Sequence, residues 1–463
     1  MIKMLNGERI IDNLFLFMSA IIIPISFFAP IGLWIPLLIS SIILFLIEKN
    51  KKIFLKFDSR IELILIILIL YMGLSLLWSI NSSHGLIHLI HLSILFFSLK
   101  IVLTYCKRIK NLNRIKNTLF FSFIISCAIS TADMGLNLEI KSLMLAFSDN
   151  ISSIEDIKEF SIKRILTNTK DFSEGMYSGL YNRGLSFLII FAFILGKIFY
   201  EEKTKFYLLI FLTTLLILVA ESYTAAAVMI VSLATIVLIK ILKQSFNLIF
   251  PFFLVLYFVV SPLLLNFSSE KNWTHEYKNL IEKLTECEET LEKNPGNLLV
   301  LLKSNFLHLQ HKLFHRKIIW NYTTNRIKEN YIFGKGLSSS RKIGETDKII
   351  LEKFSYIHKN KTFYESRKIY PAIPLHPHNQ TLQIWLELGF VGILIFLLLH
   401  LLLWKKITLY VKKYSYSDVF LISTFIGTFV INQISFGLWQ IWWLSGIGYF
   451  VIYTYLFNKF KTN

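Results

Sequence analysis

The sequence predicts an all-α polytopic membrane protein, with about 12 transmembrane helices and a mostly helical periplasmic cap between the ninth and the tenth. Of the 463 residues, 54% are hydrophobic. They lie in blocks of roughly 20 residues, the length that crosses a hydrocarbon core about 30 Å thick. Short charged stretches separate the blocks, whereas the helices of a soluble protein carry their apolar residues in amphipathic stripes.

The apolar blocks predict spans at about 10–28, 31–48, 61–80, 84–105, 117–134, 183–199, 205–221, 223–242, 246–265, 380–403, 416–437 and 440–457. The connections 135–182 and 266–379 are too long to be turns. The chain therefore divides into 1–265 with nine spans, the predicted cap 266–379, and 380–463 with three spans.

The net charge of +19 is placed mostly in short loops between apolar blocks. Basic loops beside membrane spans stay in the cytoplasm, so the charge indicates topology rather than nucleic-acid binding. With both termini in the cytoplasm, the short outer connections carry no Lys or Arg. The three cysteines are far apart in sequence, which predicts neither a disulfide framework nor a zinc site.

The predicted cap contains two helical segments. Residues 271–293 have apolar side chains at a helix-like period, and Asn294-Pro295-Gly296-Asn297 predicts a turn after them. A second helix is predicted from Leu298 to about Arg326, and Phe333-Gly334-Lys335-Gly336 ends it.

The run His376-Pro377-His378-Asn379 precedes the tenth span and is followed by Gly389-x-x-Gly392. If the span begins near Asn379, His378 lies at the positive end of a helix dipole, where free N–H groups favour an anion such as phosphate. The dipole also favours a neutral, basic imidazole. The alternative is a histidine that caps the helix and hydrogen-bonds a neighbouring carbonyl.

The run from His376 to Gly392, HPHNQTLQIWLELGFVG, resembles the signature of the O-antigen ligase family. That signature is a His followed by one of Asn, Ser or Gln, then nine residues and then Gly-x-x-Gly. Three further segments resemble the family in the same order: Tyr181-Asn182-Arg183-Gly184, His315-Arg316-x-x-x-Trp320 and the glycine-rich stretch Phe333 to Arg341. The resemblance covers roughly residues 180–400.

The resemblance implies transfer of a glycan from undecaprenyl pyrophosphate to a sugar hydroxyl of lipid A–core, in lipopolysaccharide biosynthesis. The reaction would invert the anomeric centre on the periplasmic face of the bacterial inner membrane, without a metal or another cofactor. The implied partners are the lipid-linked donor, the lipid A–core acceptor and membrane lipids, with no nucleic acid.

Three residues are the candidates for catalysis. Arginine matches phosphate oxygens with a planar pair of donors, so Arg316 and Arg183 would stabilise the pyrophosphate leaving group. A neutral imidazole suits removal of the acceptor's hydroxyl proton, a role that His378 would fill. His378 could instead align the attacking oxygen, and Arg183 could be an interfacial anchor.

The further substrate-binding candidates are Arg341, Asn379, His376, Trp320 and Glu387. Arg341 binds phosphate or solvates a loop, and His376 shapes the turn. Trp320 shares a helix face with Arg316, so the two could simply pack. Glu387 lies roughly 13 Å along an ideal helix from His378, and is either paired inside the bundle or faces a substrate's polar head.

One segment departs from the family pattern. Many members carry an arginine at the outer turn between the seventh and eighth spans, where this chain has Glu221-Ser222-Tyr223-Thr224-Ala225. Either Arg183 supplies the missing phosphate contact or the geometry differs. The form HPHNxxLQxWLELG favours a ligase over an O-antigen or capsule polymerase with a lipid-linked acceptor. A transporter or lipid flippase is a more remote alternative, because the halves show no repeat.

Overall fold

A computed structural model describes residues 2–57, 59–135, 176–220, 222–266, 273–294, 296–358, 361–411 and 416–459. Most of the predicted 135–182 loop lies outside the described residues. The chain forms two compact units. Unit 1 is Met1–Leu63, Ile90–Pro251 and Leu401–Asn463, and unit 2 is Ile64–Leu89 and Phe252–His400. The three-part division predicted from the sequence depends on where a membrane lies and stays a prediction.

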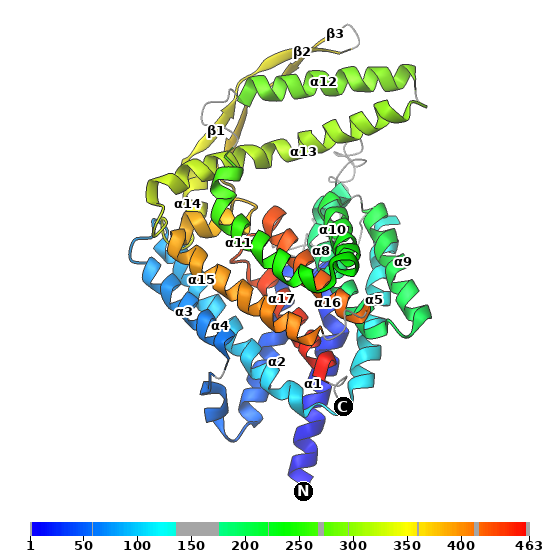
Figure 1. Cartoon of the computed structure of the whole chain (residues 1–463), viewed down its shortest axis with the longest axis vertical. Helices are drawn as coiled ribbons and strands as arrows, with labels where there is room; N and C mark the ends of the chain where they lie inside the picture. Colours follow the sequence, from blue (N-terminus) through cyan, green and yellow to red (C-terminus); the bar gives the residue numbers. More distant parts are fainter. Residues whose placement is uncertain are drawn as a thin grey trace, which may run out of the picture. The chain divides into compact units, whose positions relative to one another are not determined.

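Each of the twelve predicted apolar ranges contains a helix (Figure 1). These helices are α1 (Ile2–Phe28), α2 (Trp34–Ile47), α3 (Arg60–Ser75), α4 (Ser82–Tyr105), α5 (Leu112–Gly135), α8 (Met176–Phe199), α9 (Lys203–Val219), α10 (Tyr223–Leu242), α11 (Phe246–Leu264), α15 (Gln380–Tyr410), α16 (Tyr416–Ile434) and α17 (Ile441–Lys459). Short 3-10 turns cover Pro30–Leu33, Lys51–Leu55, Cys106–Arg108, Lys243–Ser245 and Lys328–Asn330.

Among the described residues, 7 helical stretches are long and apolar enough to cross a membrane. They are Glu8–Phe28, Pro30–Ile47, Ser82–Arg108, Leu112–Met134, Asn182–Phe199, Thr224–Leu264 and Gln380–Leu409. The sixth includes both α10 and α11. The chain is therefore a multi-pass membrane protein. The remaining apolar helices are shorter or less apolar, so the count of 12 spans stays a prediction.

The core of unit 1 is rich in aromatic side chains. The ring of Phe187 on α8 lies 5.4 Å from Phe191 and 5.2 Å from Phe450 on α17, between centroids. Some polar groups inside this bundle are paired, as where the hydroxyls of Ser19 and Tyr453 lie 2.9 Å apart. The start of α1 and the end of α17 lie toward the same end of unit 1 (Figure 1).

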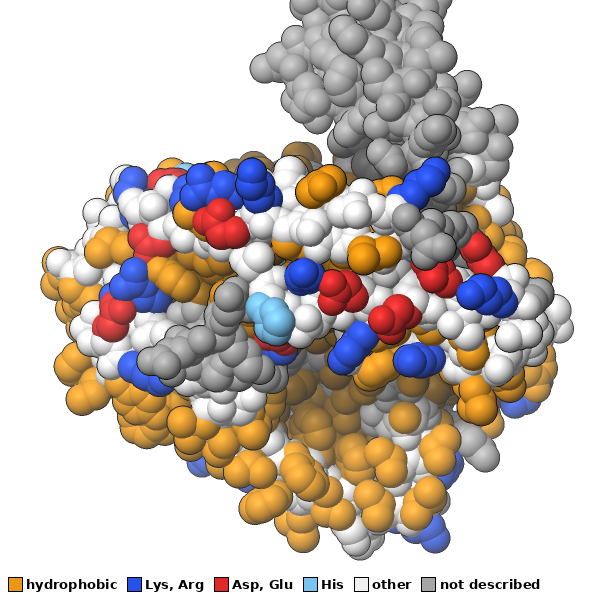
Figure 2. Space-filling view, turned by 90° about the horizontal axis from the view of Figure 1, so that it is seen from above, with side chains coloured by type: hydrophobic (Ala, Val, Ile, Leu, Met, Phe, Trp, Pro, Cys, Tyr) orange, Lys and Arg blue, Asp and Glu red, His pale blue; other side chains and the backbone are white. Residues whose placement is uncertain are grey.

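Unit 2 contains the antiparallel pair α12 (Trp273–Lys293) and α13 (Leu298–Ile327), which confirms both helices predicted there. Asn297 caps α13, because its Oδ1 accepts hydrogen bonds from the N–H groups of Leu299 and Val300. The two helices pack through buried residues, among them Tyr277 and Phe314. On the face drawn in Figure 2, acidic and basic side chains are interspersed. Ion pairs such as Lys317–Glu276 join α13 to α12.

Four short strands follow a third helix, α14 (Ser339–Thr346), and they correct the all-α prediction for this segment. Strand β1 (Lys348–Leu351) pairs antiparallel with β4 (Lys368–Pro371), and β2 (Phe354–His358) with β3 (Lys361–Glu365). Each strand is only four or five residues long, so its alternation carries little signal in the sequence. The aromatic residues were the available sign, alternating in β2 (Phe354 and Tyr356) and adjacent in β3 (Phe363 and Tyr364).

Candidate functional site

Helix α15 begins directly after the two-histidine run, as predicted. Asn379 caps the helix, because its Oδ1 accepts a hydrogen bond from the Leu382 N–H at 2.9 Å. The Asn379 Nδ2 donates to the hydroxyl of Tyr257 on α11 at 3.0 Å. Both ends of the Asn379 amide are therefore hydrogen-bonded within the protein, and His378 stands immediately before the cap.

His378 has a left-handed backbone, with φ of 54°, which is uncommon for a residue with a side chain. Its N–H donates to His376 Nδ1 at 3.1 Å, and the two ring centroids lie 4.4 Å apart, edge to face. Because Nδ1 of His376 accepts, a neutral His376 carries its proton on Nε2. His376 is buried and His378 is half-buried. The role of shaping the turn, predicted for His376, agrees with these contacts.

Helix α13 reaches this turn through Trp320. The indole N–H of Trp320 donates to the carbonyl oxygen of Pro377 at 2.9 Å, next to His378 in the chain. Arg316 lies four residues earlier in α13 and so shares the face of Trp320. The structure thus brings the Trp320 face of α13 to the histidine turn.

Arg316 is half-buried, and it makes no hydrogen bond or ion pair with any of the described residues. Burial lowers its pKa, because the charged guanidinium is partly removed from water. Burial and the charge of Arg316 also lower the pKa of the adjacent His315. The Nε2 of His315 is buried without a hydrogen-bond partner in the described part of the chain. Within the described part of the chain, this turn of α13 therefore holds a cation without a carboxylate partner.

The glycine-rich stretch is joined to α15 by its backbone. Residues 331–338 lie against residues 386–391, and we call this pairing the clasp. The N–H groups of Lys335 and Gly336 donate to the carbonyls of Leu386 and Glu387, both at 2.8 Å. In return, Phe390 N–H donates to Tyr331 at 2.9 Å. Two motifs that the sequence presents separately thus form one structure.

Two glycines make this close approach possible. Gly389 has φ 65° and ψ −161°, a backbone region that is essentially restricted to glycine. A Cβ on Gly389 would lie 2.5 Å from Gly334 N, and one on Gly334 would lie 2.5 Å from the carbonyl carbon of Glu387. Each position therefore excludes a side chain, which gives a physical reason for Gly389 in the signature.

The carboxylate of Glu387 holds the other end of the clasp and is fully buried. It accepts hydrogen bonds from Ser338 N–H at 2.8 Å, Ser340 Oγ at 2.5 Å and Gln383 Nε2 at 3.2 Å. The two alternatives for Glu387 were pairing inside the bundle and facing a substrate's polar head, and these contacts match the first. Its serine partners were not predicted from the sequence, although Ser338-Ser339-Ser340 lies beside the glycines.

The turn between α3 and α4 supports the clasp from a third side. Ser79 Oγ donates to the carbonyl of Leu337 at 2.7 Å, and Asn81 Nδ2 donates to that of Ser338 at 3.2 Å. Leu337 N–H donates to Ser75 Oγ at 3.2 Å. Residues some 260 positions apart in the chain thus fix the loop that precedes α14.

Arg341 projects from the first turn of α14. Its Nη1 lies 2.7 Å from Nε2 of His84 in the first turn of α4. Helix α14 also touches the segment before the histidine turn, because a Cβ on Gly344 would collide with the carbonyl of Ile373. His84 and its neighbour His88 were not predicted as site residues, although their spacing of four residues on a helix was an available signal.

Arg183 belongs to unit 1. Helix α8 begins at Met176, so Arg183 lies about two turns inside the helix rather than at its start. The neighbouring Asn182 Oδ1 accepts a hydrogen bond from Ser222 Oγ at 3.0 Å. The residue before Arg183 therefore contacts the turn where many family members carry an arginine. Its guanidinium lies 5.6 Å from the ring centroid of Trp442.

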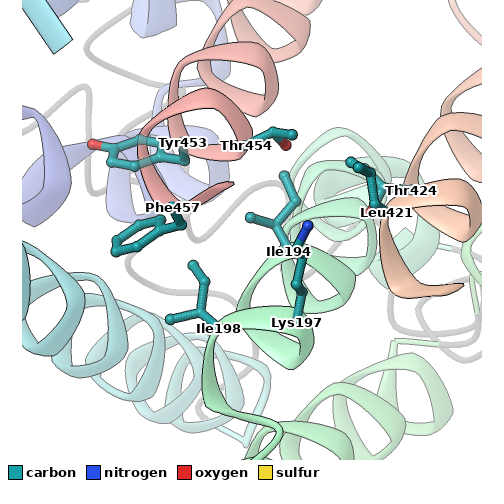
Figure 3. Close-up of a pocket in the computed structure, with 8 residues that line it drawn as sticks. All are labelled: Ile194, Lys197, Ile198, Leu421, Thr424, Tyr453, Thr454 and Phe457. Carbon is teal, nitrogen blue, oxygen red and sulfur yellow. The ribbon is translucent and has the colours of Figure 1, made fainter. Parts of the chain in front are cut away.

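Unit 1 also has a small pocket between α8, α16 and α17 (Figure 3). Its lining is mainly apolar, and Lys197 donates a hydrogen bond to Asn458 Oδ1. The pocket contains none of the candidate site residues, so the candidate site is defined by contacts between elements. The lining residues are Ile194, Lys197, Ile198, Leu421, Thr424, Tyr453, Thr454 and Phe457.

The sequence comparisons address the family of the chain. A family model described as O-Antigen ligase matches residues 208–397, a range that includes every candidate site residue except Arg183. A Rickettsia conorii protein named "Putative polysaccharide ligase" is 36% identical over 144 residues, which cover 31% of this chain and 32% of the relative. A Rickettsia prowazekii protein with the same description is 35% identical over 153 residues, 33% of this chain and 34% of its own.

The matched regions span about a third of the length of these relatives. No solved structure matches the chain. The family model, these relatives and the signature that the fold places at the start of α15 agree with one another. Over residues 208–397 the chain is similar to the O-antigen ligase family.

Proposed function

We propose that the protein is an O-antigen ligase, a membrane glycosyltransferase that moves a glycan from undecaprenyl pyrophosphate to a sugar hydroxyl of lipid A–core. The reaction would take place on the periplasmic face of the inner membrane. The observation that supports the proposal most directly is the uncompensated Arg316, one helical turn from the Trp320 that holds the carbonyl before His378. The similarity of residues 208–397 to the O-antigen ligase family supports the same reaction class.

In the proposed reaction, the acceptor oxygen attacks the anomeric carbon from the side opposite the pyrophosphate. The bond between the anomeric carbon and the phosphate oxygen breaks as the new glycosidic bond forms, so the configuration inverts. The His378 imidazole takes the proton of the acceptor hydroxyl, because a carbohydrate hydroxyl is a weak nucleophile until a base removes its proton. The proton then passes to water.

The departing pyrophosphate gains negative charge as the bond breaks. A guanidinium without a carboxylate partner has its full charge available for that group, and partial burial strengthens the attraction. Arg316 fills this role in the proposal. Arg183 is the candidate for a second phosphate contact, on the strength of the family resemblance and of the contact between the preceding Asn182 and Ser222.

Complementation in a bacterium that lacks its own ligase tests the proposal. The strain must still make undecaprenyl-linked O-antigen and a cognate lipid A–core. We expect the protein to restore polymer-bearing lipopolysaccharide on gels and His378→Ala to abolish it at equal protein level. His275→Ala, at an exposed histidine of α12, is the matched control and should remain active. Full activity of His378→Ala would remove that histidine from the chemistry.

The same strain separates the ligase from a polymerase of related chemistry. A polymerase would lengthen the lipid-linked glycan without attaching it to lipid A–core. Accumulation of long lipid-linked polymer, with no change in the core-linked fraction, would therefore favour the polymerase.

A further inference from the structure

We propose that Arg341, His84 and His88 form a second phosphate-binding site, which takes a phosphate group of one of the lipid-linked substrates. The proposal rests on the proposed function for the identity of the ligand. The site lies where the first turn of α14 meets the first turns of α4, within unit 2 (Figure 1).

The contact between Arg341 and His84 leaves the charge of the arginine available. A guanidinium has only N–H donors, so Nε2 of His84 must accept the hydrogen bond at 2.7 Å. His84 then carries its proton on Nδ1 and is neutral. The imidazole therefore orients Arg341 without cancelling its charge, which a carboxylate would do.

The carboxylate nearest to Arg341 is a weak partner. Glu345 Oε1 lies 3.8 Å from Arg341 Nε, and the Glu345 side chain is 54% exposed, so water screens the pair. Among the described residues, no other carboxylate forms an ion pair with Arg341, and its Nη2 has no hydrogen-bond partner. Arg341 can thus offer donors to a further acceptor.

The two histidines connect the arginine to the clasp. The rings of His84 and His88 lie 5.8 Å apart, edge to face, on adjacent turns of α4. Nδ1 of His88 is 2.5 Å from Ser338 Oγ, and Ser338 has a left-handed backbone with φ 65°. The Ser338 N–H is held by buried Glu387. The cluster is therefore built on a rigid loop rather than on a mobile surface.

The chemistry of the cluster fits a phosphate. An arginine held by a neutral acceptor, with donors left over, matches the oxygens of a phosphate group. The N-terminal ends of α4 and α14 both contribute positive helix-dipole charge there. Two lipid-linked substrates of the proposed reaction carry such groups, the pyrophosphate donor and the phosphorylated lipid A acceptor.

Binding of inorganic pyrophosphate to the full chain in detergent micelles, followed by calorimetry, tests the site. We expect Arg341→Gln to weaken binding about tenfold, the effect of losing one hydrogen bond to a charged group. His84→Ala and His88→Ala should each weaken it several-fold. Lys342→Gln, which removes an equal charge from the next residue of α14, is the matched control and should bind as the wild type does.

A variant that is expected to bind pyrophosphate more tightly gives a result that misfolding cannot produce. Glu345→Gln removes the nearby carboxylate from an exposed position and should tighten pyrophosphate binding about twofold. No binding by the wild type, equal losses in Arg341→Gln and Lys342→Gln, or no gain in Glu345→Gln would each overturn the proposal. These measurements need no acceptor, so their failure is separate from failure of the ligase assay.

Competition then identifies the source of the phosphate. Undecaprenyl pyrophosphate without a glycan, lipid A with its phosphates and dephosphorylated lipid A are each added to the complex with pyrophosphate. Displacement by the first that persists in Arg316→Gln, which lacks the proposed leaving-group contact, places the donor at this site. Displacement by phosphorylated but not by dephosphorylated lipid A places the acceptor there. If neither lipid displaces pyrophosphate, the assignment to a lipid-linked substrate is wrong.

Discussion

The clasp and the Arg316 turn of α13 differ in how their polar groups are satisfied. In the clasp, the buried carboxylate of Glu387 accepts three hydrogen bonds, and the backbones of residues 331–338 and 386–391 pair with each other. In the Arg316 turn, a half-buried guanidinium has no partner among the described residues. Paired groups build the fold, whereas an uncompensated charge costs free energy and is available to a ligand.

Helix α13 itself repeats the contrast near its C-terminal end. The guanidinium of Arg326 donates to Tyr322 at 2.8 Å, Glu329 at 2.7 Å and Asp347 at 2.6 Å, and these contacts raise its pKa. Ten residues separate this structural arginine from Arg316, which has no ion-pair partner among the described residues. The comparison makes separate predictions for stability and for activity.

The largest expected effect is on activity. Arg316→Gln should lower transfer by about 10²- to 10³-fold, the usual loss when a group that stabilises developing charge is removed. Its thermal stability should stay equal or rise, because a partly desolvated charge disappears. Arg316→Lys should also be strongly impaired, since lysine lacks the paired donor geometry. Arg367→Gln, at an exposed arginine, is the control. Wild-type turnover in both Arg316 variants would show that the Arg316 guanidinium does not stabilise the leaving group.

Glu387→Ala should show the opposite pattern, with a loss of stability. The change leaves the Ser338 N–H, Ser340 hydroxyl and Gln383 amide without their buried acceptor, which costs about 3 kcal/mol or more. Thermal unfolding in detergent measures the effect, and Glu345→Gln at an exposed carboxylate serves as the control. An unchanged unfolding temperature would show that the clasp does not depend on this carboxylate.

Gly389→Ala should destabilise the clasp by about 2 kcal/mol, because alanine is strained in this backbone region and its Cβ meets the backbone of the glycine-rich stretch. Gly296→Ala is the matched control, since a Cβ there meets nothing within 4 Å. Equal unfolding temperatures for the two variants would contradict the proposed reason for the signature glycine.

Trp320→Phe should have a smaller effect on both properties. The ring remains, but the hydrogen bond to the Pro377 carbonyl is lost, a change of about 1 kcal/mol. We expect a few-fold lower turnover, because the histidine turn is held less firmly. Turnover and unfolding temperature are measured together. A large fall in stability without a change in turnover would show that Trp320 serves packing alone.

The smallest effect is a pH dependence at His315. Its folded-state pKa is lowered by burial and by Arg316, so the folded chain binds fewer protons than the unfolded chain. The stability that depends on a neutral His315 is fully present above the ordinary pKa of 6.5 and is lost as the pH falls below that value. His315→Gln should therefore lose less stability than the wild type on acidification. Identical pH profiles of the unfolding temperature would contradict this assignment.

Much of the helical part could be predicted from the sequence, since hydrophobic block length and helical period are local properties. The start of α15 after Asn379 and the helix pair α12–α13 are examples. The strands β1–β4 were missed, because they are short and each is stabilised by a partner elsewhere in the chain. The motifs around Arg316, Arg341 and His378 could be identified, but their contacts could not.

The sequence by itself determined that the chain crosses a membrane several times, and it identified the signature residues, because both depend on residue type and spacing. Only the tertiary structure decided that Gly334 meets Gly389, that Glu387 is used internally, and that Arg341 meets His84. The physical reason is that these contacts join distant segments. The clasp is moreover made largely by backbone groups, which every residue carries, so its pairing leaves few marks in the sequence.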